Sequence, residues 1–93
     1  MVNSPQSTGR LAAYIARRDD CWKAINFSKS IRDRGRRRSY LLEKAQGFLS
    51  ADEYDHAALL AWHILYQVDA RSLQAHQILN LAYHRIFSRP PRP

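Results

Sequence analysis

The four histidines are the residues whose type first suggests metal chemistry. His56 and His63 lie seven residues apart, which places both on one face of a helix but two turns from each other. A chelating pair on a helix is normally four residues apart, and Cys21 is the single cysteine, so no second thiol completes a zinc site. We therefore interpret His56, His63, His76 and His84 as helix-surface or interhelical residues, and we expect no metal ion and no cofactor.

Cys21 is the other residue that suggests catalysis, because a thiolate is a nucleophile. A reactive cysteine needs a lowered pKa and a neighbouring base, whereas Cys21 stands beside Trp22 on or near the apolar face of its helix. No serine lies in a glycine-flanked elbow, and no glycine-rich loop is present to hold phosphates. Helix capping explains Asp52, Glu53 and Asp55. The sequence thus predicts a buried structural cysteine and a protein that is not an enzyme.

The basic residues are concentrated in the first part of the chain. Residues 1–39 carry a net charge of +7, and residues 40–93 carry a net charge of zero. Five arginines stand within seven residues: Arg32, Arg34, Arg36, Arg37 and Arg38. Arginine pairs bidentately with phosphates and carboxylates. Three interpretations remain open: an arm that binds nucleic acid, a patch that binds an acidic protein face, or a solvated loop without a fixed partner.

Two aromatic residues give one helix a second apolar face. Trp62 and Tyr66 lie four residues apart. Tyr66 falls off the apolar stripe of that helix, which consists of Ala57, Ala61 and Leu65. Two apolar faces on one helix of a small protein indicate a second contact surface. Self-association is the simplest interpretation, and a different protein partner is the alternative. The expected partner-binding residues are Trp62, Tyr66 and Trp22 as apolar anchors, with Arg34, Arg36, Arg37 and Arg38 as an electrostatic rim.

The apolar spacing predicts an all-α fold, a small bundle of about four helices. We expect helices at 8–33, 38–49, 51–68 and 71–87, with a hinge at 34–38 around Gly35. These form a single helical domain at 8–87, between a flexible tail at 1–7 and a Pro-rich tail at 88–93. Ser50 to Glu53 fits a capping box that begins the third helix. Asp69 or Ser72 is expected to cap the fourth helix.

The residues from about Leu41 to Ile86 resemble one and a half tetratricopeptide repeats, a helical-hairpin repeat of about 34 residues. The residues that match the first helix of the repeat are Ala45 and Phe48; those that match the second helix are Tyr54, Ala57, Ala61 and Leu65. Asp69 matches the turn, and Ala75, Leu79, Asn80 and Tyr83 repeat the first-helix pattern. The resemblance implies antiparallel hairpin packing and a groove that binds peptide or protein.

A helix-turn-helix interpretation can also be placed on residues 57–83. Its turn would lie around Gln67 to Arg71. The second helix of such a motif exposes polar residues near its start to read bases. The residues available for that role are Arg71, Ser72, Gln74 and Gln77.

The leading hypothesis from the sequence is a small, non-catalytic protein–protein interaction module. It would act as an adaptor, a chaperone-like holder or a regulator that masks a partner protein, most simply as a homodimer. The alternative is a small basic regulator, transcriptional in kind, that binds nucleic acid through the cluster Arg32 to Arg38. No apolar run approaches the roughly 20 residues needed to cross a bilayer, so we expect no membrane partner. Because the single cysteine excludes an intramolecular disulfide, we expect a cytoplasmic protein.

Overall fold

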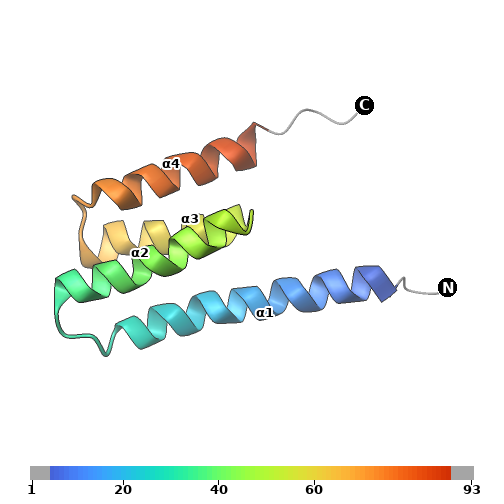
Figure 1. The fold of residues 1–93 in the computed structure, drawn as a ribbon, viewed down its shortest axis with the longest axis horizontal. Helices are drawn as coiled ribbons and strands as arrows, with labels where there is room; N and C mark the ends of the chain where they lie inside the picture. Colours follow the sequence, from blue (N-terminus) through green and yellow to red (C-terminus); the bar gives the residue numbers. More distant parts are fainter. Residues whose placement is uncertain (1–4, 89–93) are drawn as a thin grey trace.

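The chain folds into four antiparallel helices joined by short turns (Figure 1). The computed structural model describes residues 5–88, with side chains for residue 12 and residues 15–88. The elements are α1 (Pro5–Ser28), α2 (Arg34–Ser50), α3 (Tyr54–His63), η1 (Ile64–Val68) and α4 (Leu73–Phe87). Each helix runs in the direction opposite to the one before it, and α3 lies behind α2 in the view of Figure 1. The predicted all-α bundle is confirmed, and the described residues contain no strand.

The first turn lies earlier in the chain than the sequence predicted. Residues 29–33 connect α1 to α2, and the hinge predicted at 34–38 is wrong because α2 begins at Arg34. Asp33 is the N-cap of α2: its Oδ1 accepts a hydrogen bond from the Arg36 N–H at 3.1 Å. Gly35 therefore stands in the first helical turn, where a Cβ would lie 3.2 Å from the capping Oδ1 of Asp33. The arginine cluster is thus helical from Arg34 onward.

The turn between α2 and α3 is a Schellman motif, and the predicted capping box at Ser50 is wrong. Ser50 is the last residue of α2, and α3 begins at Tyr54. Asp52 has a φ of 60°, in the left-handed region. Its N–H donates to the Leu49 carbonyl at 3.1 Å, and the Glu53 N–H donates to the Phe48 carbonyl at 2.9 Å. These bonds satisfy the last carbonyls of α2, so Ser50 ends one helix and does not begin the next.

The helix predicted at 51–68 consists of α3 followed by a π-helical turn. This turn, η1, closes where the Asp69 N–H donates to the Ile64 carbonyl at 2.7 Å. Ser72 then caps α4, accepting from the Ala75 N–H at 3.2 Å, which confirms one of the two predicted caps. The first helix was predicted at 8–33 and extends from Pro5 to Ser28. Residues 5–7 of the tail predicted at 1–7 belong to α1, so this boundary is wrong. Residues 1–4 and 89–93, the rest of the two predicted tails apart from Ser88, lie outside the described residues.

The core lies where α1, α2 and α4 meet α3. Small side chains allow the helices to approach closely, and the fully buried alanines are Ala45, Ala57, Ala61, Ala75 and Ala82. Leu41, Leu60 and Ile64 fill the space between them and are themselves fully buried. Helix α1 contributes Cys21, Ala24, Ile25 and Ser28, whereas Trp22 is directed to the surface. None of the described helices is both long and apolar enough to cross a membrane.

Candidate interaction surfaces

Trp62 and Tyr66 form a stacked aromatic pair on the outer side of α3 and η1. Their ring centroids lie 4.2 Å apart at an interplanar angle of 31°. Trp62 is 45% exposed and Tyr66 is 67% exposed. The other sides of the helix are occupied, because α3 packs against α1, α2 and α4. The pair is therefore fixed on the one side of α3 that no other described helix covers.

Trp22, the third predicted anchor, is exposed on α1. It is 49% exposed, and no ring contact joins it to the aromatic pair within the described part of the chain. Its neighbour Cys21 is fully buried against α3, with Sγ 3.9 Å from the His56 carbonyl oxygen. The structure thus places Trp22 beside the contact of α1 with α3, without a ring contact to Trp62 or Tyr66.

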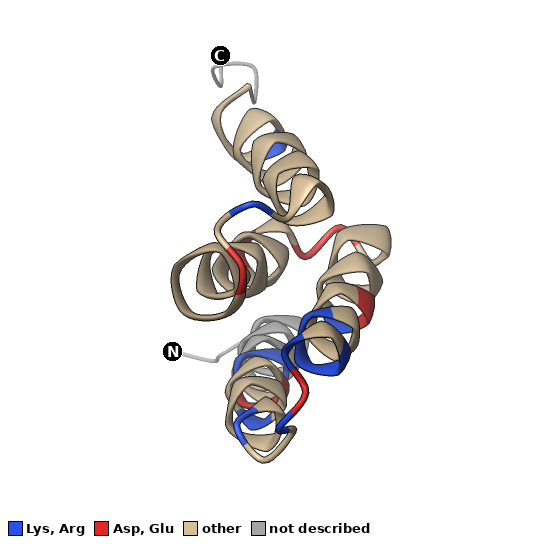
Figure 2. Ribbon diagram, turned by 90° about the vertical axis from the view of Figure 1, so that its left-hand side faces the viewer, with Lys and Arg blue, Asp and Glu red and all other residues tan. Residues whose placement is uncertain are grey.

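The basic residues gather at one end of the bundle, where α1 ends and α2 and α4 begin (Figure 2). We call this the basic end. Its cations are Lys29, Arg32, Arg34, Arg36, Arg37, Arg38 and Arg71, and its carboxylates are Asp33 and Asp69. The N-termini of α2 and α4 meet the C-termini of α1 and η1 at this end, so the helix dipoles largely cancel and the charge comes from the side chains. This end of the molecule therefore attracts anionic groups.

Two of the five clustered arginines make contacts within the chain. Arg37 donates from Nε to the Ser28 carbonyl at 2.9 Å and from Nη2 to the Lys29 carbonyl at 3.3 Å, so it caps the end of α1. Arg38 Nη1 lies 2.6 Å from Asp69 Oδ2. The side chains of Arg32, Arg34 and Arg36 make no hydrogen bond or ion pair with any described residue. Only these three guanidinium groups of the cluster remain open to a partner.

His63 shows that the basic end adjoins the last turn of α3. The pKa of His63 is lowered, first by burial and then by the positive charges of Lys29 and Arg37. His63 follows Trp62 directly in α3. The end of α1 and the first turns of α2 therefore lie close to the last turn of α3. The sequence predicted these residue types but not that the fold brings these segments together.

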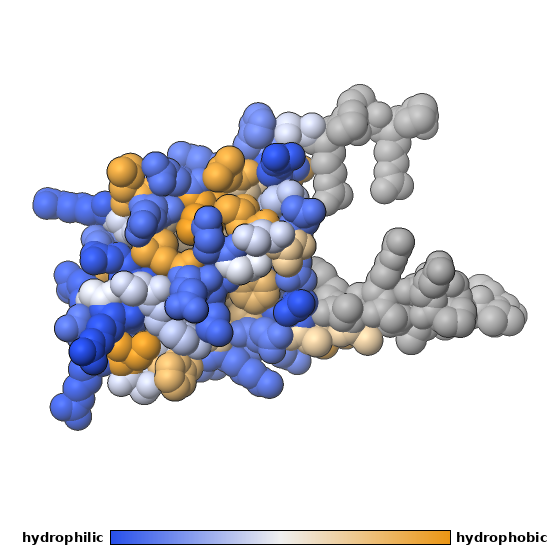
Figure 3. Space-filling model, in the orientation of Figure 1, coloured by the Kyte–Doolittle hydropathy of each residue, from blue (hydrophilic) through white to orange (hydrophobic). Residues whose placement is uncertain are grey.

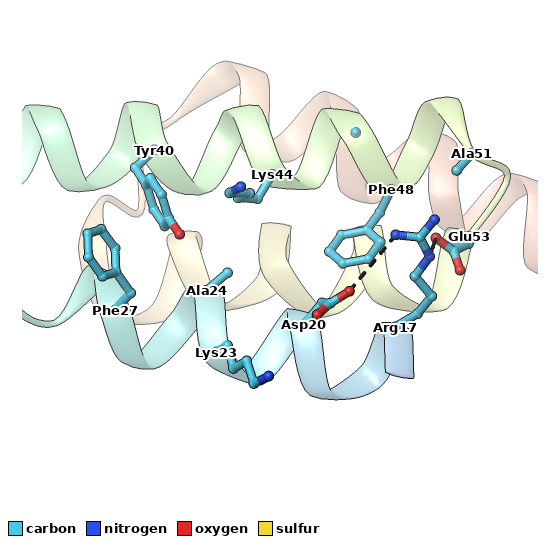
Figure 4. Close-up of a pocket in the computed structure, with 11 residues that line it drawn as sticks. Arg17, Asp20, Lys23, Ala24, Phe27, Tyr40, Lys44, Phe48, Ala51 and Glu53 are labelled. Carbon is cyan, nitrogen blue, oxygen red and sulfur yellow. Dashed lines mark ion pairs between the residues drawn. The ribbon is translucent and has the colours of Figure 1, made fainter. Parts of the chain in front are cut away.

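A cleft of about 510 Å³ lies between α1 and α2, and the sequence analysis missed it (Figure 4). Aromatic rings, small residues and charged side chains line it: Arg17, Asp20, Lys23, Ala24, Phe27, Tyr40, Lys44, Gly47, Phe48, Ala51 and Glu53. Figure 4 shows the Phe27–Tyr40 ring pair at one end and Arg17 with Glu53 at the other. Gly47 lines the cleft on the α2 side, at an exposed position where a Cβ would meet nothing within 4 Å.

A second groove, of about 380 Å³, lies between α2 and α4. Leucines, an isoleucine and polar side chains line it: Leu42, Glu43, Gln46, Leu49, Gln74, Gln77, Ile78 and Leu81. Figure 3 shows apolar side chains gathered over α4 and the adjoining part of α2. Of the residues considered for base reading, Gln74 and Gln77 lie in this groove, Ser72 is the buried cap of α4, and Arg71 is exposed.

Cys21, His56 and His76, which suggested catalysis or metal binding in the sequence, are buried or in contact with other groups of the fold. Burial raises the pKa of the Cys21 thiol to about 11, which disfavours the thiolate. His56 is buried with its ring centroid 5.4 Å from that of Phe48, and the His76 ring nitrogen lies 3.1 Å from the Ala70 carbonyl oxygen. Among residues 5–88, no group of three His, Cys, Asp or Glu side chains is placed to hold a metal ion.

Comparison of the chain with protein-family models, with curated proteins and with solved structures finds no match.

Proposed function

We propose that this chain is a small, non-catalytic interaction protein that covers a surface of another protein through its aromatic pair. In this proposal the same pair joins two copies of the chain when no partner is bound, and the protein acts as an adaptor, holder or regulator. The observation that carries the proposal is the stacked and exposed pair of Trp62 and Tyr66. Large aromatic side chains in a fixed geometry supply much of the binding energy of protein interfaces at low entropic cost.

The charge distribution supports a protein partner with an acidic edge. Arg34 and Arg36 supply the electrostatic rim, whereas Arg37 and Arg38 are engaged within the chain. Rim charges mainly raise the rate of association and select the partner, while a buried aromatic core provides affinity. Positions 58 and 70, one helical turn before and after the pair, are both alanine, so α3 and its continuation present no cation of their own at these positions.

We also infer that α2, α3 and α4 form a tetratricopeptide-like hairpin set. The support is the antiparallel order of the three helices and the small residues in their core, since Ala57 and Ala61 of α3 and Ala75 of α4 are all fully buried. A lone buried Cys21 is compatible with a reducing compartment, and we propose the cytoplasm as the location.

Light scattering after size exclusion tests the proposed self-association. We expect the wild-type chain to elute with twice the 10.8 kDa mass of one chain, and Trp62→Ala to elute with the mass of a single chain. Phe27→Ala is the matched control. Phe27 is 57% exposed and also belongs to a ring pair, with Tyr40, but that pair lies on the α1–α2 cleft. A Trp62→Ala variant that stays folded and dimeric would refute the proposed anchor.

Nucleic-acid binding is the second candidate, and the open guanidinium groups of Arg32, Arg34 and Arg36 favour it. Phosphate contacts release counterions, so the affinity of such a complex falls steeply with salt. The triple change of these arginines to glutamine should abolish duplex binding, and Arg85→Gln on α4 is the control for a single lost charge away from the basic end. Duplex binding that survives the triple change would place the contact elsewhere. Arg38 is unsuitable for this test because its removal breaks the Asp69 ion pair.

A further inference from the structure

We propose that the α1–α2 cleft binds a peptide segment of a partner protein in which an aromatic side chain stands next to a carboxylate. The cleft lies apart from the aromatic pair, so this inference does not depend on the function of Trp62 and Tyr66. Its volume of about 510 Å³ falls within the range of sites that hold small ligands or single side chains.

One end of the cleft can accommodate an apolar ring. Phe27 and Tyr40 face each other across the two helices, with ring centroids 5.1 Å apart at an interplanar angle of 47°. Phe27 is 57% exposed, which leaves most of its ring surface uncovered. Ala24 provides the space beside these rings. Gly47, two helical turns after Tyr40, leaves space farther along the cleft, where a Cβ would meet nothing within 4 Å. An incoming aromatic side chain would cover apolar surface that now faces water.

The middle of the cleft carries positive charge that no carboxylate of the chain neutralises. Figure 4 shows Lys23 on α1 and Lys44 on α2, between the ring pair and the opposite end. Lys44 Nζ lies 5.5 Å from the centroid of the Tyr40 ring, and neither lysine forms an ion pair with a described residue. The two acidic residues of the cleft are both paired with Arg17, whose guanidinium lies 3.9 Å from Asp20 and 3.4 Å from Glu53. The lysines therefore favour an anionic group on the ligand.

The far end of the cleft offers a hydrogen-bond acceptor to a ligand. Glu53 is 24% exposed, but its Oε2 is buried, with Arg17 Nε 3.4 Å away, so its other carboxylate oxygen is the one that a ligand can reach. A backbone N–H of an extended segment can donate a hydrogen bond to this oxygen. The combination of a ring, a carboxylate and an N–H is that of an acidic peptide.

Titration of the ¹⁵N-labelled protein with blocked dipeptides tests the assignment. The probes are N-acetyl-Phe-Glu-amide and N-acetyl-Phe-Lys-amide, which differ in the sign of one charge. We expect the acidic probe to shift the amide signals of Ala24 and Gly47 and to bind at least about fivefold more tightly than the basic one. Lys23→Gln and Lys44→Gln should each weaken the acidic probe about three- to fivefold, whereas Lys29→Gln, outside the cleft, should not.

Gly47→Leu provides a variant that fills the cleft without removing any contact, because this position has open space around it and leucine favours helix. It should abolish binding of the acidic probe while the protein stays folded, and Trp62→Ala should leave binding unchanged. Equal affinity for the acidic and basic probes, or an equal loss in Lys29→Gln and Lys44→Gln, would overturn the proposal. Equal binding of 4-phenylbutyrate, which has a ring and a carboxylate but no N–H, would overturn the assignment of a peptide.

Discussion

Arg38 and Asp69 join two segments that are 31 residues apart, with Nη1 of the arginine 2.6 Å from Oδ2 of the aspartate. Asp69 Oδ1 also accepts from the Arg71 N–H at 3.0 Å. The Arg38–Asp69 ion pair therefore connects the first turns of α2 to the segment between η1 and α4. An arginine of the basic cluster thus helps to hold together the end of the bundle at which the aromatic pair lies.

We expect Arg38→Gln to lower the urea midpoint of unfolding, and Arg36→Gln to leave it unchanged. The Arg36 guanidinium has no partner in the described chain, whereas Arg38 loses its ion pair. The pKa of Asp69 lies below its ordinary value because of the Arg71 N–H first and the Arg38 hydrogen bond second. The stability that Asp69 contributes is therefore present above its unfolded pKa of about 4 and is lost as the pH falls further. Equal urea midpoints for the two variants would show that the ion pair is not structural.

Gly47→Ala should raise the free energy of unfolding by about 0.5–1 kcal/mol, measured by urea denaturation. Gly47 lies in the interior of α2, and alanine restricts the unfolded chain and adds a Cβ in open space. Gly35→Ala is the control, because its Cβ would lie 3.2 Å from the Asp33 oxygen that caps the helix. A gain at Gly35 as large as that at Gly47 would contradict the capping geometry of α2.

Asp52→Val should cost about 1–2 kcal/mol of stability, because a β-branched residue is strained at a φ of 60°. Asp52→Asn should stay within about 0.5 kcal/mol of the wild type, since asparagine adopts the left-handed region and keeps an acceptor for the Tyr54 hydroxyl. Thermal unfolding of the two variants measures the difference. If valine is tolerated as well as asparagine, the α2–α3 turn does not have the left-handed geometry.

The pKa of His63, measured by NMR titration, should lie below its ordinary value of about 6.5. Burial and the charges of Lys29 and Arg37 both favour the neutral imidazole. The unfolded chain then binds more protons than the folded one between the two pKa values, so stability falls as the pH drops below about 6.5. His63→Gln should flatten this pH dependence, and Lys29→Gln should raise the pKa of His63. A pKa at or above 6.5 would show that the basic end does not adjoin α3.

The sequence predicted the number of helices and the Ser72 cap, because apolar spacing and local capping chemistry depend on neighbouring residues. It misplaced the α1–α2 and α2–α3 turns. Asp33 is an N-cap that the sequence analysis did not single out, and Asp52 adopts a left-handed conformation that is more often found for glycine. The internal contacts of Arg37 could not be predicted either, since they depend on how the ends of α1 and α2 meet in space. The α1–α2 cleft was missed for the same reason.

Acrylamide quenching of Trp62 fluorescence tests the central claim most directly, because it measures whether this ring becomes covered. The Trp22→Phe variant leaves Trp62 as the only tryptophan, and Trp62→Phe, which leaves Trp22, is the comparison. If the aromatic pair is an interface between copies, quenching of Trp62 should decrease as the protein concentration rises from micromolar to millimolar, and Tyr66→Ala should remove the effect. Quenching of Trp62 that is independent of concentration, with Tyr66 present or absent, would contradict the claim.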